Sequence, residues 1–252
     1  MRVEVVVALI SAGVALVSVA VSTWAARSTA TVQAELEERR RQASKDELLE
    51  QVMSRYREPL LRAAFDLQSR LYNIMKQNFL GIFARKGTPA EQAYARGNTL
   101  FVLAEYLGWV EILRRGVQFL DLGEVERNRE LVERLEAIST TLADSRALTD
   151  PCFRVFRGQQ RAIGELMMDR SGSGGQGDAG QCIGYAAFSA RLAGDAEFAR
   201  WFEQLSGDLD HLADDLAPGR ERLVGLQRTL MDLIDFLDDP PKRFSAAQRA
   251  RL

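Results

Sequence analysis

Residues 5–26 contain no charged side chain, and this 22-residue run constrains the chain more than any other feature of its sequence. It consists mainly of Val, Ala, Leu and Ile. As an α-helix it would extend about 33 Å, enough to cross the hydrocarbon core of a bilayer, which is about 30 Å thick. Trp24 stands near its end, where aromatic side chains meet the lipid head groups. We therefore expect a single transmembrane anchor in residues 1–27, with residues 5–26 in contact with the lipid bilayer.

The charges on either side of this run predict its orientation. Arg2, offset by Glu4, precedes it, whereas Arg27 and the cluster Arg39–Arg41 follow it. Because Lys and Arg accumulate on the cytoplasmic side of membrane spans, we expect the N-terminus outside the cell and the rest of the chain in the cytoplasm. The alternative is a cleaved signal peptide, since residues 18–20 (Ser-Val-Ala) have the pattern of a cleavage site. The scarcity of cations before the run favours the uncleaved anchor.

Residues 28–58 are predicted to form a charged helical stalk. Glu35 and Arg39, like Glu37 and Arg41, stand four residues apart with the acid first, the order that supports a solvated helix. The apolar positions of this segment follow a ragged heptad spacing, which allows weak association of the stalk with a second copy of the chain. We interpret the stalk mainly as a spacer.

Helical periodicity dominates the remaining chain. Apolar residues recur at three- and four-residue spacing, and no segment shows sustained alternation with period two. Pro59 is expected to begin the first helix and Pro151 a later one. Thr88 and Glu91 predict a capping box at the start of a helix that runs to about residue 119.

These observations predict an all-α fold: a single transmembrane helix, a helical stalk, and a cytoplasmic bundle of about seven helices. The bundle domain is expected at residues 59–240, followed by a basic tail at 241–252. The net charge of −2 does not indicate a nucleic-acid partner. Cys152 and Cys182 fit no metal-ligand spacing, and we expect them to be reduced in the cytoplasm; an exported domain could join them in a disulfide.

The sequence lacks the usual catalytic patterns, including a nucleophile elbow, a Walker or Rossmann glycine motif and a zinc signature. His211, the only histidine, shares a helix face with Asp208 and Asp215. We interpret this face as a solvated acidic surface, because no second ligand-bearing motif accompanies it. We therefore predict no catalytic residue, metal or cofactor.

The segment 151–169 is rich in arginine beside an apolar face, and the preceding helix carries further charges. The candidate ligand-binding residues are Arg154, Arg157, Arg161, Glu165, Arg114, Arg115, Glu111 and Glu105. Grouped guanidinium groups can bind a phosphate or carboxylate bidentately. Alternatively, Arg154, Arg157 and Arg161 pair internally with Glu105, Glu111 or Glu165 and set the register of the helices, and we favour this interpretation.

Arg161 makes the internal pairing testable. We expect its side chain at the edge of the apolar face, in an ion pair with Glu105 or Glu111, or locally with Glu165. Loss of one partner of a buried pair is costly. This interpretation therefore predicts that Arg161→Ala lowers the melting temperature.

Four sequence blocks carry a resemblance to a known group: FDLQSRLYNI, LGWVEILRRGVQFLDLG, FRVFRGQQRAIGELM and CIGYAAF. Over residues 56–240 the chain resembles a group of uncharacterised bacterial proteins, commonest in actinobacteria. The resemblance supports one helical domain and assigns no catalytic residue.

The sequence thus favours a membrane-tethered scaffold, adaptor or sensor without catalytic activity, acting on an unknown protein partner. The alternative is binding of a small anionic ligand, with or without catalysis, through the arginine-rich segment 151–169.

Overall fold

The structure, a computed structural model, describes residues 33, 35–44, 55–117, 125–145, 151–169, 180–239 and 243–252. The chain divides into two compact units, Met1–Gln51 and Val52–Leu252. Helices dominate the described residues, so the predicted all-α class is confirmed. The expected membrane span at 5–26 lies outside the described residues. Within the ranges that are described, no helix has both the length and the apolar composition needed to cross a bilayer.

In the first unit, residues 35–44 form a helix whose residues are all exposed. Arg39 Nη2 lies 2.8 Å from Glu35 Oε1, and Arg41 Nη2 lies 3.7 Å from Glu37 Oε2. Both predicted pairs are therefore present. They are the local contacts that a solvated helix is expected to make.

The second unit contains a helix over residues 55–77, which includes Pro59. The expectation that Pro59 begins this helix is wrong, because the turn at Arg55 and Tyr56 is already helical. The side chain of Tyr56 is buried and contacts Gly116 of the following helix α2 (Pro89–Val117). Tertiary packing of this tyrosine thus stabilises the helical turn that precedes the proline.

The connection to α2 turns sharply. Asn78 has a φ of 51°, in the left-handed region that asparagine tolerates better than most residues. The π-helical segment η1 (Leu80–Arg85) follows. The predicted capping box of α2 is confirmed, since the Thr88 amide and hydroxyl both donate to Glu91 Oε2, at 2.7 and 2.8 Å.

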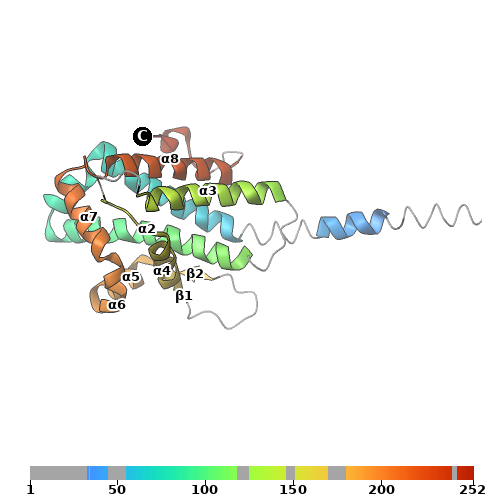
Figure 1. Cartoon of the computed structure of the whole chain (residues 1–252), viewed down its shortest axis with the longest axis horizontal. Coiled ribbons are helices and arrows are strands. Elements are labelled where there is room, and N and C mark those ends of the chain that lie inside the picture. The colour runs from blue at the N-terminus through green and yellow to red at the C-terminus, as the bar shows by residue number, and fades with distance from the viewer. Residues whose placement is uncertain are drawn as a thin grey trace, which may run out of the picture. The chain divides into compact units, whose positions relative to one another are not determined.

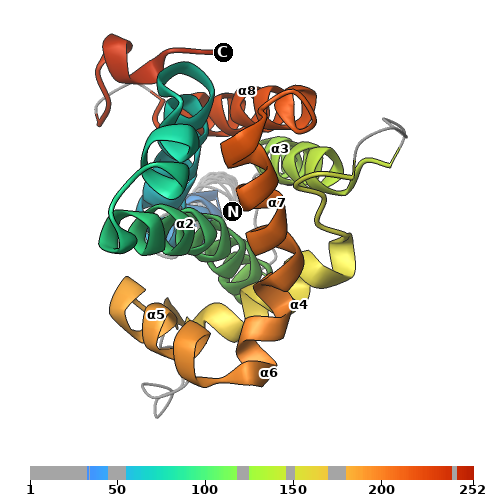
Figure 2. The same ribbon diagram turned by 90° about the vertical axis from the view of Figure 1, so that its left-hand side faces the viewer.

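Four long helices form the body of this unit: the 55–77 helix, α2, α3 (Val125–Ala143) and α8 (Arg220–Leu237). They run in alternating directions along the horizontal axis of Figure 1, as in an up-and-down bundle. Figure 2 looks along them, with α7 crossing in front. Among the shorter elements and α8, α3 packs chiefly on α8, whereas α2 packs on both α4 and η1.

The segment between α3 and α8 forms a second group of shorter elements. They are α4 (Arg157–Met167), β1 (Met168–Asp169), β2 (Gln181–Cys182), α5 (Tyr185–Gly194), α6 (Ala196–Ala199), η2 (Arg200–Phe202) and α7 (Glu203–Asp214). The strands, which the periodicity did not predict, pair antiparallel, with Met168 opposite Cys182. Both cysteines of the chain are free thiols.

Helix α4 begins later than Pro151, where the sequence predicted its start. The buried residue Phe153 has a φ of 58° and interrupts helical geometry. Its amide donates to Asp208 Oδ2 of α7 at 2.9 Å. This long-range hydrogen bond stabilises a turn that the local sequence does not favour, so the helix starts at Arg157.

Phe188 of α5 attaches the shorter elements to α2. Its ring packs against Phe101 of α2 and against Phe198 and Phe202, with centroids 5.2–5.5 Å apart in edge-to-face geometry. All four rings are buried. Aromatic packing of this kind contributes both apolar burial and a preferred ring geometry.

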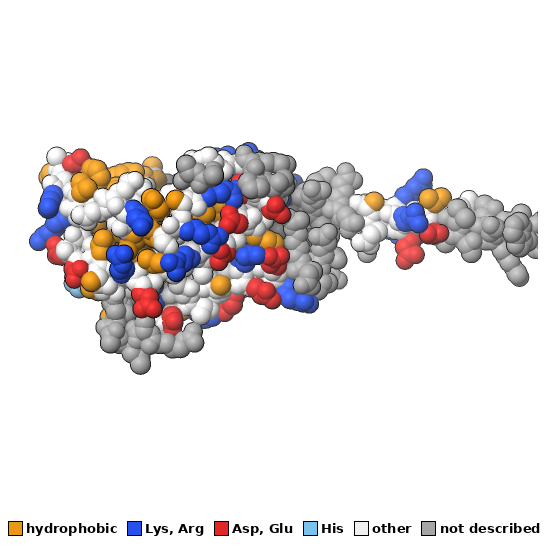
Figure 3. All heavy atoms as spheres, turned by 90° about the horizontal axis from the view of Figure 1, so that it is seen from above, with side chains coloured by type: hydrophobic (Ala, Val, Ile, Leu, Met, Phe, Trp, Pro, Cys, Tyr) orange, Lys and Arg blue, Asp and Glu red, His pale blue; other side chains and the backbone are white. Residues whose placement is uncertain are grey.

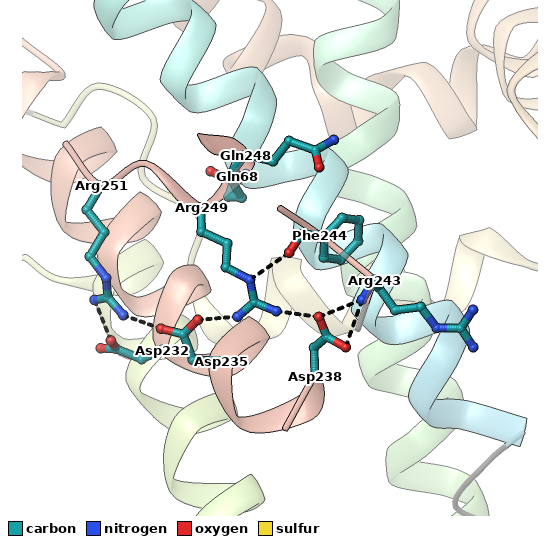
Figure 4. Close-up of polar contacts among 9 residues, drawn as sticks. All are labelled: Gln68, Asp232, Asp235, Asp238, Arg243, Phe244, Gln248, Arg249 and Arg251. Carbon is teal, nitrogen blue, oxygen red and sulfur yellow. Dashed lines mark hydrogen bonds and ion pairs between the residues drawn. The ribbon is translucent and has the colours of Figure 1, made fainter. Parts of the chain in front are cut away.

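The C-terminal residues 243–252 pack on α8 and the 55–77 helix (Figure 4). The ring of Phe244 stacks on Phe65, with centroids 3.7 Å apart and planes 3° apart. Arg249 pairs with Asp235 and Asp238, and Arg251 pairs with Asp232 and Asp235. In the predicted basic tail, Arg249 and Arg251 are thus neutralised by acids of α8 and its end, whereas Arg243 pairs with Glu58 of the 55–77 helix at 3.1 Å. Figure 3 views the molecule from this upper side, where arginine, acidic and hydrophobic side chains intermingle.

Candidate functional site

The buried carboxylate of Glu111 organises the charges on α2. Its side chain is 3% exposed and accepts hydrogen bonds from Arg114 Nε at 2.8 Å, Arg114 Nη2 at 2.6 Å and Arg115 Nε at 2.7 Å. Burial raises the pKa of Glu111, but the hydrogen bonds from the two arginines outweigh it and hold the pKa below its usual value. Glu111 is therefore a charged structural group.

Gly164 of α4 allows this part of α2 to approach closely. A Cβ atom at Gly164 would lie 2.7 Å from the Leu107 carbonyl oxygen and 2.9 Å from Glu111 Cβ. A Cβ atom essentially never approaches other heavy atoms this closely, so glycine is the residue that fits here without a shift of the backbone. Close contact in turn places Glu165 of α4 3.1 Å from Arg115 Nη2 of α2, an ion pair between helices that the sequence did not predict.

The arginines of α4 behave differently from one another. Arg157 pairs with Glu136 of α3 and donates from Nη2 to Thr140 Oγ1 at 3.0 Å. Arg161 is exposed and has no ion pair with any carboxylate among the described residues. The predicted pair between Arg161 and Glu105, Glu111 or Glu165 is therefore wrong. Glu165 contacts Arg115 instead, and a base four residues before an acid is the less favourable order on a helix.

Arg154 and Glu105 lie outside this group. The Arg154 guanidinium lies 5.3 Å from the centre of the Phe156 ring, before α4 begins. Glu105 of α2 is partly buried, and its pKa is raised to about 7, first by burial and then by the negative charge of Asp66 on the 55–77 helix. The structure thus brings together Glu111, Arg114, Arg115 and Glu165, and separates Glu105 and Arg154 from them.

A cavity of about 500 Å³ lies between α2, α3 and α4. The residues that line it are Leu107, Val110, Glu111, Leu113, Arg114, Leu131, Val132, Leu135, Glu136, Ser139, Arg157, Gln160 and Arg161. Around it, α4 packs on both α2 and α3, while α3 also packs on α8.

Leucine and valine side chains from α2 and α3 form the apolar walls of this cavity. Val132 is 62% exposed, although it lies on the side of α3 that faces the cavity. Five charged residues lie among these walls: Glu111, Arg114, Glu136, Arg157 and Arg161. Apolar walls with a few placed polar groups are typical of sites that bind small organic molecules.

No protein-family model, curated protein or solved structure matches this chain. The resemblance of residues 56–240 to a group of bacterial proteins therefore stays a prediction.

The acidic face of α7 has structural roles. Asp208 accepts the hydrogen bond from Phe153, and Asp215 Oδ1 accepts one from the Ala217 amide at 2.9 Å. His211 is exposed. In the part of the chain that the structure describes, no group of three or more His, Cys, Asp or Glu side chains is placed to hold a metal ion.

Sequence reasoning missed three residues that shape the cavity. Glu136 and Val132 lie on α3, whose contacts with α4 the sequence could not indicate. Gln160 is buried, and its Nε2 donates to the carbonyl oxygens of Ser139 at 3.0 Å and Val155 at 2.8 Å. A glutamine within an apolar face is the one local signal that could have pointed to this packing.

Proposed function

We propose that this protein is a non-catalytic helical sensor or adaptor, tethered to a membrane, that binds a ligand in the cavity between α2, α3 and α4. The observation that carries the proposal is the apolar cavity of about 500 Å³. Its volume falls in the range of roughly 300–1,000 Å³ typical of small-molecule sites. A partner protein would bind differently to the bundle when the cavity is occupied and when it is empty.

The charges at the cavity favour binding over catalysis. Glu111 and Glu136 are held as charged groups by hydrogen bonds with Arg114, Arg115 and Arg157. A general base needs a pKa near the working pH, whereas the pKa values of both carboxylates are lowered by these arginines. The lining residues named above include no His, Cys, Lys or Tyr.

The tether is proposed from the uncharged residues 5–26 and from the cations that follow them. In this topology the N-terminus lies outside the cell and the bundle in the cytoplasm. The stalk serves as a spacer, with weak self-association through its ragged heptads. A C-terminal reporter that is active only in the cytoplasm should work, whereas activity of an export-dependent reporter would overturn the topology.

Ligand binding in the cavity can be tested with a variant whose side chain fills the cavity. Val132→Trp adds a large side chain at an exposed position that lines the cavity, so it is not expected to disturb the core. The full chain in lipid nanodiscs is labelled with a neutral, diazirine-bearing dodecanol, and labelled peptides are mapped by mass spectrometry. We expect labelling of α2 and α3 that Val132→Trp strongly reduces.

Ala186→Trp is the matched control, since Ala186 is exposed on α5 and does not line the cavity. It should leave the labelling unchanged. Equal labelling in all three proteins, or no labelling of α2 and α3, would refute the binding function.

A further inference from the structure

We propose that the ligand is a single-chain amphiphile with one carboxylate head group, which binds Arg161 while its apolar chain fills the cavity. This inference rests on the proposed function and narrows it to one class of ligand. Three features carry it: the balance of charge at the cavity, the position of Arg161, and the size of the space.

Among the charged residues that line the cavity, one arginine has no carboxylate partner in the described part of the chain. Three arginines and two glutamates line the cavity. Glu136 pairs with Arg157, and Glu111 pairs with Arg114. Arg115, which does not line the cavity, is itself shared between Glu111 and Glu165. Arg161 is thus the one cavity-lining guanidinium that has no carboxylate partner among the described residues.

The position of Arg161 also suits binding of the ligand's carboxylate head group. Its helix, α4, contributes only polar side chains to the lining, whereas α2 and α3 contribute all of the leucines and valines together with four polar residues. The Gln160 amide N–H groups already donate to Ser139 and Val155, and Arg157 is paired with Glu136. Among the α4 residues that line the cavity, Arg161 is therefore the one whose charge no described carboxylate neutralises. A molecule that satisfies both regions has an acidic group at one end and an apolar body.

The single unpaired arginine at the cavity favours a ligand with one negative charge over a ligand with two. One guanidinium matches one carboxylate in charge and in bidentate geometry. A phosphate monoester carries a charge of about −1.5 to −2 at neutral pH, which exceeds the single positive charge of Arg161. The cavity volume of about 500 Å³ suits a small molecule, whereas a docked helix about 10 Å wide needs a longer groove.

The test uses a photoreactive dodecanoic acid with a diazirine near the end of its chain, applied to the full chain in lipid nanodiscs. Unlabelled dodecanoate, dodecyl phosphate and dodecyltrimethylammonium compete with it. We expect dodecanoate to compete best and the trimethylammonium compound worst. Arg161→Gln should weaken dodecanoate competition about tenfold or more, while Arg220→Gln, at an exposed position on α8, should not.

The outcomes separate this inference from the proposed function. If Val132→Trp blocks the neutral dodecanol probe but Arg161→Gln leaves dodecanoate competition unchanged, the cavity binds apolar molecules and the carboxylate assignment is overturned. Stronger competition by dodecyl phosphate would overturn it in favour of a phosphate head group. If neither probe labels α2 and α3, both proposals fail.

Discussion

The carboxylate of Glu165 lies 3.1 Å from the guanidinium of Arg115 on the neighbouring helix α2. Arg161, one turn before Glu165 on its own helix, therefore remains without a carboxylate partner among the described residues. A contact between two helices thus decides which arginine is structural and which can meet a ligand.

Arg161→Ala is expected to change the free energy of unfolding by less than about 0.5 kcal/mol, as at other exposed positions. Glu111→Ala should cost about 2 kcal/mol, because it removes hydrogen bonds from two arginines to a buried carboxylate. Urea denaturation of the full chain measures both. A loss above 1 kcal/mol for Arg161→Ala would restore the internal pairing that the sequence suggested.

Two glycines of α4 make a matched pair. Gly164→Ala should destabilise the protein by about 1–3 kcal/mol, because its methyl group would overlap the Leu107 carbonyl and Glu111. Gly158 has no atom within 4 Å of a Cβ position, so Gly158→Ala should stabilise the helix by up to about 1 kcal/mol. Thermal melting distinguishes them, and equal effects would contradict the close crossing of α2 and α4.

Arg222 of α8 joins α3 to the turn before α4. Its guanidinium donates to the carbonyl oxygens of Thr141 at 3.2 Å, Asp144 at 2.9 Å and Cys152 at 3.1 Å. It thereby satisfies carbonyl groups that the end of a helix leaves unpaired. Arg222→Ala should cost about 2–3 kcal/mol, measured by denaturation. Arg220→Ala is the control and should have little effect, since Arg220 is exposed.

The arginines near the C-terminus differ in burial and should differ in effect. The Arg249 side chain is 13% exposed and pairs with Asp238, which is 5% exposed, whereas Arg251 is 44% exposed. Arg249→Ala removes the cation beside a buried carboxylate and should cost about 3 kcal/mol. Arg251→Ala should cost less than about 1 kcal/mol. Similar losses in melting experiments would show that Arg249 is not buried in solution.

Glu105 should give the protein a distinctive pH dependence. Burial and Asp66 raise its pKa from 4.5 to about 7 in the folded state. Between pH 4.5 and 7 the unfolded chain releases a proton that the folded chain keeps. The contribution of Glu105 to stability therefore falls as the pH rises through this window and is constant above it.

Glu105→Gln should remove this dependence, so the variant should match the wild type near pH 4 and exceed its stability at pH 8. Denaturation at a series of pH values provides the measurement. Glu203→Gln, at an exposed position, should change neither value. A stability difference between Glu105→Gln and the wild type that does not vary with pH would contradict the raised pKa.

Local sequence determined the features of this protein that depend on neighbours along the chain. Helical spacing of apolar residues predicted the all-α class, Thr88 and Glu91 predicted the start of α2, and Glu35 and Arg39 predicted a pair within the stalk helix. These interactions form within one or two helical turns, so spacing in the sequence fixes their distance in space.

The tertiary structure alone decided the site. Glu165 contacts Arg115 because Gly164 lets two helices meet, and Phe153 adopts its left-handed conformation because Asp208 from α7 binds its amide. The cavity lies where side chains from α2, α3 and α4, which are far apart in the sequence, come together. Each outcome is a competition among groups far apart in the sequence, and long-range packing determines which of them lie within reach.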